Sequence, residues 1–197
     1  GDRTGSNYQF VMDNTSATVT TAYTSGRFNP GFRDNSTTFM INPFVKFKGL
    51  EFFGVYENAK GNSQQGNGET KNATTGAALA AIDDRTATQT AVDLLYRFGK
   101  TEQFYLGARY NVVNAEMLFG TNNGSQGQLK DVSIDRTAFV AGWFLTPKVL
   151  FKAEYVIQNY SDFPDVYTVD AATDYLESDR FAGGQFKGLV IQGSISF

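Results

Sequence analysis

The chain has 197 residues, with no cysteine, no histidine, one tryptophan, ten tyrosines and eighteen phenylalanines. This length suits one domain with its own core. The missing side chains exclude disulfides, thiolate nucleophiles, imidazole bases and the usual Cys/His zinc sites. With 17 basic and 20 acidic residues the chain has no excess of positive charge that would attract nucleic acid, so we do not expect nucleic acid as a partner.

Apolar and polar residues alternate along most of the chain, which predicts β-strands with one apolar and one polar face. The N-terminal part is the weakest: Thr18–Thr24 fits a strand, and Tyr8–Met12 could be another, with a turn at 13–15 between them. The clear strands, in chain order, are 39–47, 50–57, 91–98, 104–112, 133–145, 149–158 and 186–197. The pattern therefore predicts eight strands, or nine if Tyr8–Met12 is included.

Pro43 interrupts the first of the clear strands. Proline has no backbone N–H and cannot donate to a ladder of hydrogen bonds. We therefore expect a bulge or a missing hydrogen bond at this position.

The connections between strands alternate between short and long. Short turns are expected at 13–15, 48–49, 99–102 and 146–148, and long polar links at 25–36, 61–86, 119–130 and 161–183. Long links without structure are uncommon in compact soluble domains. The sequence contains no run of 18 apolar residues, so it does not predict a transmembrane helix. Together these features are typical of an all-β, antiparallel transmembrane β-barrel with short periplasmic turns and long extracellular loops.

The direction of the strands gives an expectation about the length of the full barrel. Short turns in the periplasm place Phe197 there, and nine strands would then place Gly1 outside the cell. Because complete bacterial barrels have an even strand number with both termini inside, we expect 1–197 to be the C-terminal part of a larger barrel. A complete eight-stranded barrel is the alternative if Tyr8–Met12 does not span.

Several segments resemble known outer-membrane proteins. The terminal Phe197, preceded by Ile195, Ile191 and Leu189, resembles the C-terminal signature that the barrel-assembly machinery reads, although Gly193 interrupts the series. Over most of the chain, the motifs resemble a porin-like family of Gram-negative outer membranes that is distantly similar to phosphate-selective porins. These motifs are Gly26–Phe32, INPFVKFKGLEFFGVYE from Ile41, LLYRFGK from Leu94, AGWFLT from Ala141 and KAEYV from Lys152. Members of that family are longer than this chain.

The polar faces of the predicted strands carry the candidate lumen residues. Five cations and four anions nearly balance, which favours paired charges on neighbouring strands over an anion pathway, because a phosphate-selective pore needs a ladder of one sign. The anion pathway remains the alternative. The candidates are Lys46, Glu51, Glu57, Asp93, Arg97, Arg109, Arg136, Lys152 and Glu154.

Aromatic residues on the apolar faces lie close to the short turns. Amphipathic rings settle at the depth of lipid headgroups, so these positions predict a periplasmic aromatic girdle. Its members are Tyr96, Phe98, Phe104, Trp143, Phe151 and Phe197.

The link from Asp162 to Asp179 is rich in carboxylates. Oxygen ligands at this density could hold Ca²⁺, with Asp162, Asp165, Asp170 and Asp174 as candidates, but their spacing does not match an EF-hand. A solvated acidic loop is the alternative.

We expect no enzyme and no other cofactor, since the chain has no nucleophile-elbow sequence and no histidine to activate a serine.

The sequence thus predicts an outer-membrane, porin-like barrel for passive diffusion of small polar solutes or ions. The alternative is a non-conducting structural or assembly subunit that contacts other outer-membrane proteins. A soluble ligand-binding barrel is a third hypothesis, which the long polar loops and the terminal Phe197 disfavour. The expected partners of the first two are outer-membrane lipid and, through the C-terminal strand, the barrel-assembly machinery.

Overall fold

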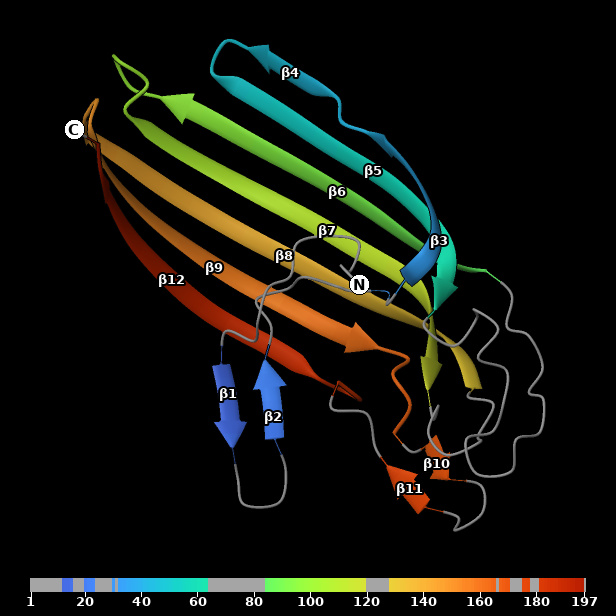
Figure 1. Ribbon diagram of the computed structural model, residues 1–197. Helices are drawn as coiled ribbons and strands as arrows, with labels where there is room; N and C mark the ends of the chain where they lie inside the picture. The colour runs from blue at the N-terminus through green and yellow to red at the C-terminus, as the bar shows by residue number, and fades with distance from the viewer. Residues whose placement is uncertain are drawn as a thin grey trace.

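The computed structural model describes residues 12–15, 20–23, 30, 32–63, 84–119, 128–165, 167–170, 175–177 and 181–196. All regular structure in these ranges is β-strand, as predicted (Figure 1). None of the described segments forms a helix with the length and hydropathy needed to cross a membrane.

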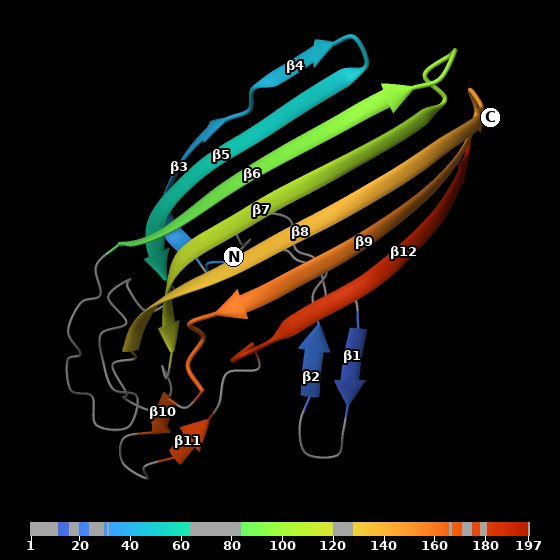
Figure 2. The ribbon, with the colours of Figure 1, turned by 180° about the vertical axis from the view of Figure 1, so that it is seen from behind.

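The main sheet is an antiparallel meander (Figures 1 and 2). Its strand order is β12-β9-β8-β7-β6-β5-β3, and β4 also pairs with β5, so strands joined by a turn or link are neighbours in space. The strands are β3 (Phe32–Ile41), β4 (Phe44–Phe47), β5 (Leu50–Ser63), β6 (Arg85–Phe98), β7 (Phe104–Phe119), β8 (Gln128–Thr146), β9 (Val149–Ser161) and β12 (Gln185–Ile195).

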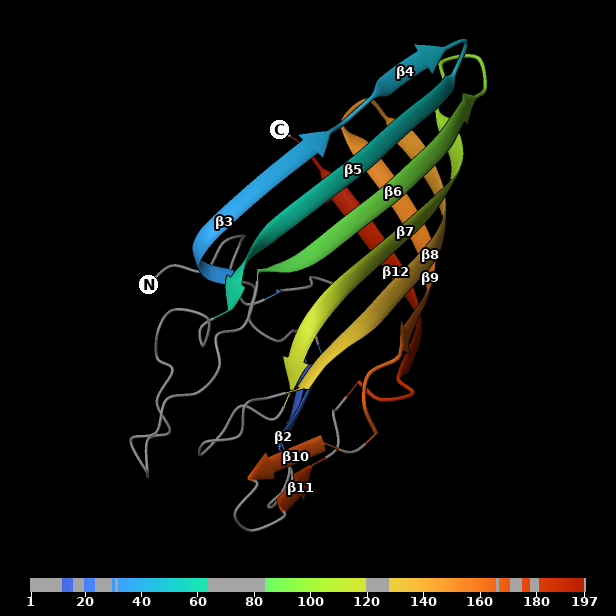
Figure 3. The same ribbon diagram turned by 90° about the vertical axis from the view of Figure 1, so that its right-hand side faces the viewer.

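The main sheet is strongly curved but open (Figure 3). Its edge strands, β3–β4 and β12, do not pair with each other. We call the end with the short turns at 48–49, 99–103 and 147–148 the short-turn end, and the opposite end the loop end. The architecture is therefore an antiparallel curved sheet, and the ring that the sequence predicts is not closed by these strands.

The N-terminal prediction is confirmed in one part and wrong in another. The predicted strand Thr18–Thr24 contains β2 (Thr20–Tyr23), whereas residues 13–15, expected as a turn, belong to β1 (Met12–Thr15), which pairs with β2. Among the described residues, β1 and β2 have four residues each, about 13 Å, against the 9–11 residues of a membrane-spanning strand, and they form a sheet separate from the main one. Residues 8–11 of the other predicted strand lie outside the described residues.

Several strands continue into links that the sequence predicts to be loops. β3 begins at Phe32, β5 ends at Ser63, β6 begins at Arg85 and β8 begins at Gln128, because backbone pairing does not require a regular alternation of apolar and polar side chains. The last long link contains β10 (Tyr167–Asp170) and β11 (Tyr175–Glu177), which pair with each other.

Pro43 separates β3 from β4 without changing the register. Ile41 lies opposite Tyr56 and Phe44 lies opposite Phe53, so both segments form one interrupted strand along β5. Gly54 N–H donates to Pro43 O over 2.9 Å, and the return bond is missing because proline has no N–H. The missing bond that the sequence predicts is confirmed, and no bulge forms.

The turn between β4 and β5 contacts the backbone of Arg97 on β6. Lys48 and Gly49 have φ values of 46° and 80°, the left-handed pair that a two-residue hairpin turn requires. Arg97 N–H donates to Gly49 O over 2.8 Å, and a Cβ on Gly49 would come within 2.5 Å of Arg97 O. A glycine at this position therefore lets β6 approach the turn.

Candidate functional site

The two faces of the main sheet differ in chemistry. On β6, Val92, Leu94 and Tyr96 point to one face and are 40–52% exposed, whereas Asp93 and Arg97 point to the other. Figure 3 shows the curvature of the sheet. We call the more exposed face, that of Leu94, the convex face, and the face of Arg97 and the buried Tyr105 the concave face. The alternation that the sequence shows is therefore a true division of the sheet into an apolar and a polar side.

Aromatic rings form a stacked row on the convex face at the short-turn end. Ring centroids are 6.1 Å apart for Tyr96 and Phe98, 5.7 Å for Phe98 and Phe104, and 5.9 Å for Phe104 and Trp143. Phe151 lies directly opposite Trp143 on the next strand. The structure thus brings together five of the six predicted girdle residues, and Phe197 lies outside the described residues.

An apolar band follows the aromatic row toward the loop end. One register row through its middle crosses six strands without a charged or strongly polar side chain, and Phe139 and Leu189 in it are 54% and 63% exposed. The row consists of Phe52, Leu94, Ala108, Phe139, Tyr155 and Leu189.

A row of polar side chains lies on the convex face at the loop end. It crosses β5 to β9 through Asn58, Thr88, Asn114, Ser133 and Ser161. Asn58 Nδ2 donates to Thr88 Oγ1 over 3.0 Å, so neighbouring strands are also linked by side chains.

The distance between the aromatic and polar rows follows from strand geometry. Ten positions separate Ser133 from Trp143 along β8. At about 3.3 Å per residue this is roughly 33 Å along the strand, or about 25 Å across the band at the usual strand tilt of about 40°. The separation of the two rows is therefore close to the height of the hydrocarbon-facing belt of a membrane barrel, with Asp135 and Lys187 on the same face in the part nearest the loop end.

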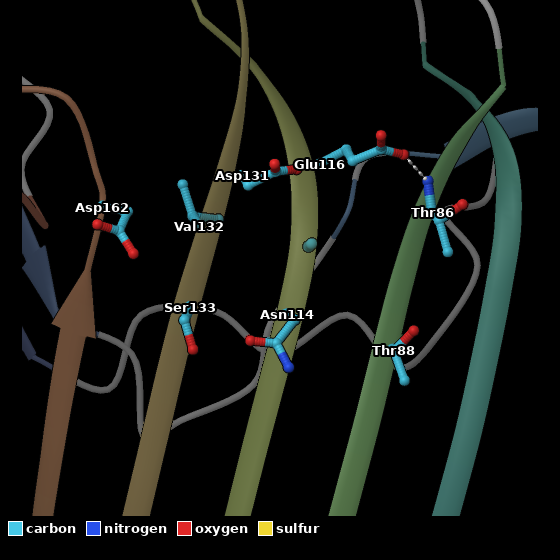
Figure 4. Close-up of a pocket in the computed structure, with 9 residues that line it drawn as sticks. Thr86, Thr88, Asn114, Glu116, Asp131, Val132, Ser133 and Asp162 are labelled. Atoms are coloured by element: carbon cyan, nitrogen blue, oxygen red, sulfur yellow. Dashed lines mark hydrogen bonds between the residues drawn. The ribbon is translucent and has the colours of Figure 1, made fainter.

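A pocket of about 340 Å³ lies at the loop end of β6, β7 and β8 (Figure 4). Glu116 and Asp131 are direct cross-strand neighbours there, a like-charge pair that destabilises a sheet. One Glu116 carboxylate oxygen accepts the Thr86 N–H over 2.7 Å. Sequence reasoning missed this pocket because the pairing of these two residues depends on strand register. The lining residues are Thr86, Thr88, Asn114, Ala115, Glu116, Asp131, Val132, Ser133 and Asp162.

Ion pairs run across the concave face at the short-turn end. Lys46 Nζ lies 3.0 Å from a Glu51 carboxylate oxygen, and Arg97 Nε lies 2.9 Å from the same oxygen. The Glu51 side chain is 19% exposed, and it forms ion pairs with both cations. β4, β5 and β6 are thus joined by one shared carboxylate.

The ion pairs continue across the next strands. Asp93 and Arg109 lie directly opposite each other on β6 and β7 and form an ion pair. Glu154 on β9 pairs with Lys152 at 3.2 Å and with Arg136 on β8 at 3.7 Å. Of the nine predicted lumen residues, eight therefore take part in ion pairs on one face, and the ninth, Glu57, points to the same face opposite Met40.

Tyr105 packs between these charges and the backbone of β8. Its ring lies over Gly142, where a Cβ would overlap the ring. The Arg97 guanidinium lies 5.5 Å from the Tyr105 ring centroid and 5.7 Å from that of Phe144. Arg97 therefore contacts two aromatic rings in addition to the Glu51 carboxylate.

The concave face changes character at the loop end, where a buried aromatic cluster replaces the charges. Phe163 is central, with ring centroids 6.4 Å from Phe119, 5.9 Å from Tyr160 and 5.5 Å from Phe181. Phe32 also belongs to this cluster and is only 1% exposed. At the loop end, the concave face is therefore covered by packed apolar side chains.

Arg85 ties this cluster to the sheet. Its side chain donates to Pro30 O over 2.7 Å and to Glu116 O over 2.6 Å, and it stacks over the Phe32 ring at 5.5 Å. At 3% exposure it is one of two buried polar residues in the described ranges. Sequence reasoning missed Arg85, which lies in a predicted link and has no local signal.

The candidate calcium ligands are only partly described. Asp162 and Asp165 are exposed, Asp170 ends β10, and Asp174 lies outside the described residues. Within the described ranges no three acidic side chains are grouped to hold a metal ion. Calcium binding by the acidic link stays a prediction.

Comparison of the chain with protein families, with curated proteins and with solved structures found no match.

Proposed function

We propose that the main sheet forms part of the wall of an outer-membrane β-barrel that lets small polar solutes or ions diffuse through its lumen. The single observation that carries this proposal is the zoning of the convex face: stacked aromatic rings lie at the short-turn end, an apolar band follows, and polar side chains begin with Lys187 on β12 and Asp135 on β8, ahead of the polar row.

The exposed apolar band is hard to reconcile with water as the solvent. Soluble monomers rarely expose apolar patches above a few hundred Å². Here large side chains on every strand of the main sheet are exposed, among them Phe47 at 65%, Leu106 at 55% and Ile191 at 74%. Lipid acyl chains remove the cost of this exposure, and Trp143 and its aromatic neighbours fit the headgroup region.

The concave face supports a weakly selective lumen. The cations of its short-turn half are paired with carboxylates, as in the Asp93–Arg109 pair, so the described residues form no ladder of one sign there. Arg109 keeps 56% of its side chain exposed and can meet a passing anion without losing its partner. This arrangement favours passage of small polar solutes over retention of one ion.

A non-conducting subunit of a larger outer-membrane complex is the second candidate. The buried cluster around Phe163 favours it, because packed side chains at the loop end narrow the space along the concave face. In either case β12, with exposed Leu189 and Ile195, is the strand that we propose the barrel-assembly machinery contacts.

The test begins with Trp143, the only tryptophan in the chain. We expect its fluorescence to be quenched in vesicles of brominated phosphatidylcholine, most by bromines near the headgroup, because the side chain is 48% exposed on the convex face. A Trp143→Phe variant gives the background, and no quenching would contradict the membrane proposal. Planar-bilayer recordings then separate the two functions: discrete current steps support the porin, and their absence supports the subunit.

A further inference from the structure

Two exposed phenylalanine rings interrupt the polar surface of the concave face. Phe44 on β4 lies directly opposite Phe53 on β5. Each is two residues from a member of the Lys46–Glu51 ion pair, so both side chains point to the concave face. Their exposed fractions are 60% and 36%. Adjacent exposed rings give a ligand an apolar surface on which to stack.

An ion pair follows the two rings in the same register row. Phe53 lies opposite Asp93, which lies opposite Arg109. The Arg109 guanidinium contacts the Asp93 carboxylate through Nε and Nη2, whereas its Nη1 donates to none of the described residues. The Arg109 and Asp93 side chains are 56% and 24% exposed. The pair therefore keeps hydrogen-bonding capacity that can reach a ligand lying on the rings.

Asn111 adds an amide to this surface. It is two residues from Arg109 on β7 and therefore points to the same face. Its Oδ1 is buried and accepts no hydrogen bond from the described residues, so the sheet does not use the full hydrogen-bonding capacity of this amide. Ala91 lies directly opposite Asn111, and its small side chain lets a ligand approach the sheet beside the ion pair.

The charges of this surface select the class of ligand. An anion would meet Arg109 only beside the Asp93 carboxylate, which repels it, and a cation would meet Asp93 only beside the guanidinium. A neutral ligand avoids both conflicts, because its hydroxyl groups can accept from Arg109 and donate to Asp93 in hydrogen bonds that the charges strengthen. The rings require an apolar face in addition. A pyranose sugar has both features, with C–H bonds on its ring faces and hydroxyl groups at its edge.

We propose that Phe44, Phe53, Asp93, Arg109 and Asn111 form a binding site for neutral sugars, which we call the sugar site. A pyranose ring stacks on the two phenylalanines, whose ring faces attract its C–H bonds, while its hydroxyl groups bond to the three polar side chains. The proposal names the class of solute for the proposed porin and rests on that function, because it requires a concave face that lines an aqueous lumen.

Phe186 provides a matched control on the same face. It lies on β12 opposite Gln158, and its exposed fraction of 38% is close to that of Phe53. Its ring lies over Gly188. Five strand spacings separate β12 from β5, roughly 24 Å along the sheet at about 4.8 Å each. A substitution there removes a similar ring without touching the sugar site.

The experiment measures binding to the full chain in detergent micelles by saturation-transfer NMR titrations with maltotriose and cellotriose. Inorganic phosphate and benzoate are the charged comparisons. We expect a trisaccharide to bind more tightly than either anion. Phe44→Ala and Phe53→Ala should each weaken its binding about three- to tenfold, the usual value of an aromatic contact, whereas Phe53→Tyr and Phe186→Ala should leave it unchanged.

Asp93→Asn tests why the ligand is neutral. The variant keeps the shape of the side chain but leaves the charge of Arg109 uncompensated. We expect it to raise the affinity for phosphate by about two- to fivefold and to lower that for the trisaccharide, because the value of an exposed ion pair is then available to the anion.

Four results would overturn the proposal: no binding of either trisaccharide, tighter binding of phosphate or benzoate by the unchanged chain, full affinity in both Phe44→Ala and Phe53→Ala, or an equal loss in Phe186→Ala. Matching far-ultraviolet circular dichroism of the variants shows that each one is folded. Failure of the proposed function appears separately, as unquenched Trp143 or absent current steps, because the titrations need neither a membrane nor an open pore.

Discussion

Close packing at one glycine holds the charged region of the concave face together. Tyr105 is 7% exposed and lies over Gly142, with Arg97 and Phe144 against it. Its ring cannot move aside without losing these contacts. The glycine therefore provides the space that the aromatic ring fills.

We expect Gly142→Ala to lower the free energy of unfolding by about 1–3 kcal/mol, the usual cost of overpacking a well-filled site. Urea unfolding of the protein in lipid vesicles measures this. Gly193→Ala is the matched control, since a Cβ there meets only the Phe151 ring at 3.7 Å. Equal stability of the two variants would mean that the Tyr105 ring is not held against β8.

At the scale of the element, Arg85 makes the start of β6 a fixed point for sequence-distant segments. It holds Pro30 and Glu116 by separate nitrogens while stacking on Phe32. Guanidinium groups suit such forked binding, and an ammonium does not.

Arg85→Lys should therefore cost about 2–3 kcal/mol of unfolding free energy, since at least one charge-assisted hydrogen bond to a buried carbonyl is lost. The matched control is Arg109→Lys, whose ion pair with Asp93 is half exposed and should change stability by less than about 1 kcal/mol. The comparison uses the same urea titration. A smaller effect at Arg85 than at Arg109 would argue against its anchoring role.

The elements also show what the sequence can predict and what it cannot. Alternation in segments such as 104–112 and 149–158 identified the strands and their faces, because side chains in a strand point to opposite sides by geometry. It could not place Glu116 opposite Asp131, which depends on register across a long link. Nor could it find Arg85, whose partners are backbone carbonyls that carry no sequence signature.

For the whole molecule, the solvent on each side of the sheet decides what a substitution costs. Leu94 and Leu95 are adjacent on β6 and point to opposite faces. Leu94 is 48% exposed in the middle of the apolar band. If this face were in water, an arginine at this position would hardly change the free energy of unfolding. If it is in lipid, the arginine would destabilise the fold.

In vesicles we expect Leu94→Arg to destabilise the fold by about 2–4 kcal/mol, the cost of a cation near the bilayer midplane. Leu95→Arg on the concave face should cost clearly less. Unfolding free energies of the two variants in the same lipid give the comparison. A cost at Leu94 no greater than that at Leu95 would contradict lipid contact by the convex face.

The order of strands in the main sheet also bears on how fast the protein reaches its folded state. The ladders of the main sheet join strands that are successive along the chain, as with β6 and β7 across residues 99–103, except that the small β10–β11 hairpin lies between β9 and β12. Low average sequence separation between contacting residues speeds folding, because little chain entropy is lost before each contact forms. Hairpins such as β4–β5, joined by the Lys48–Gly49 turn, can therefore form one after another along the chain.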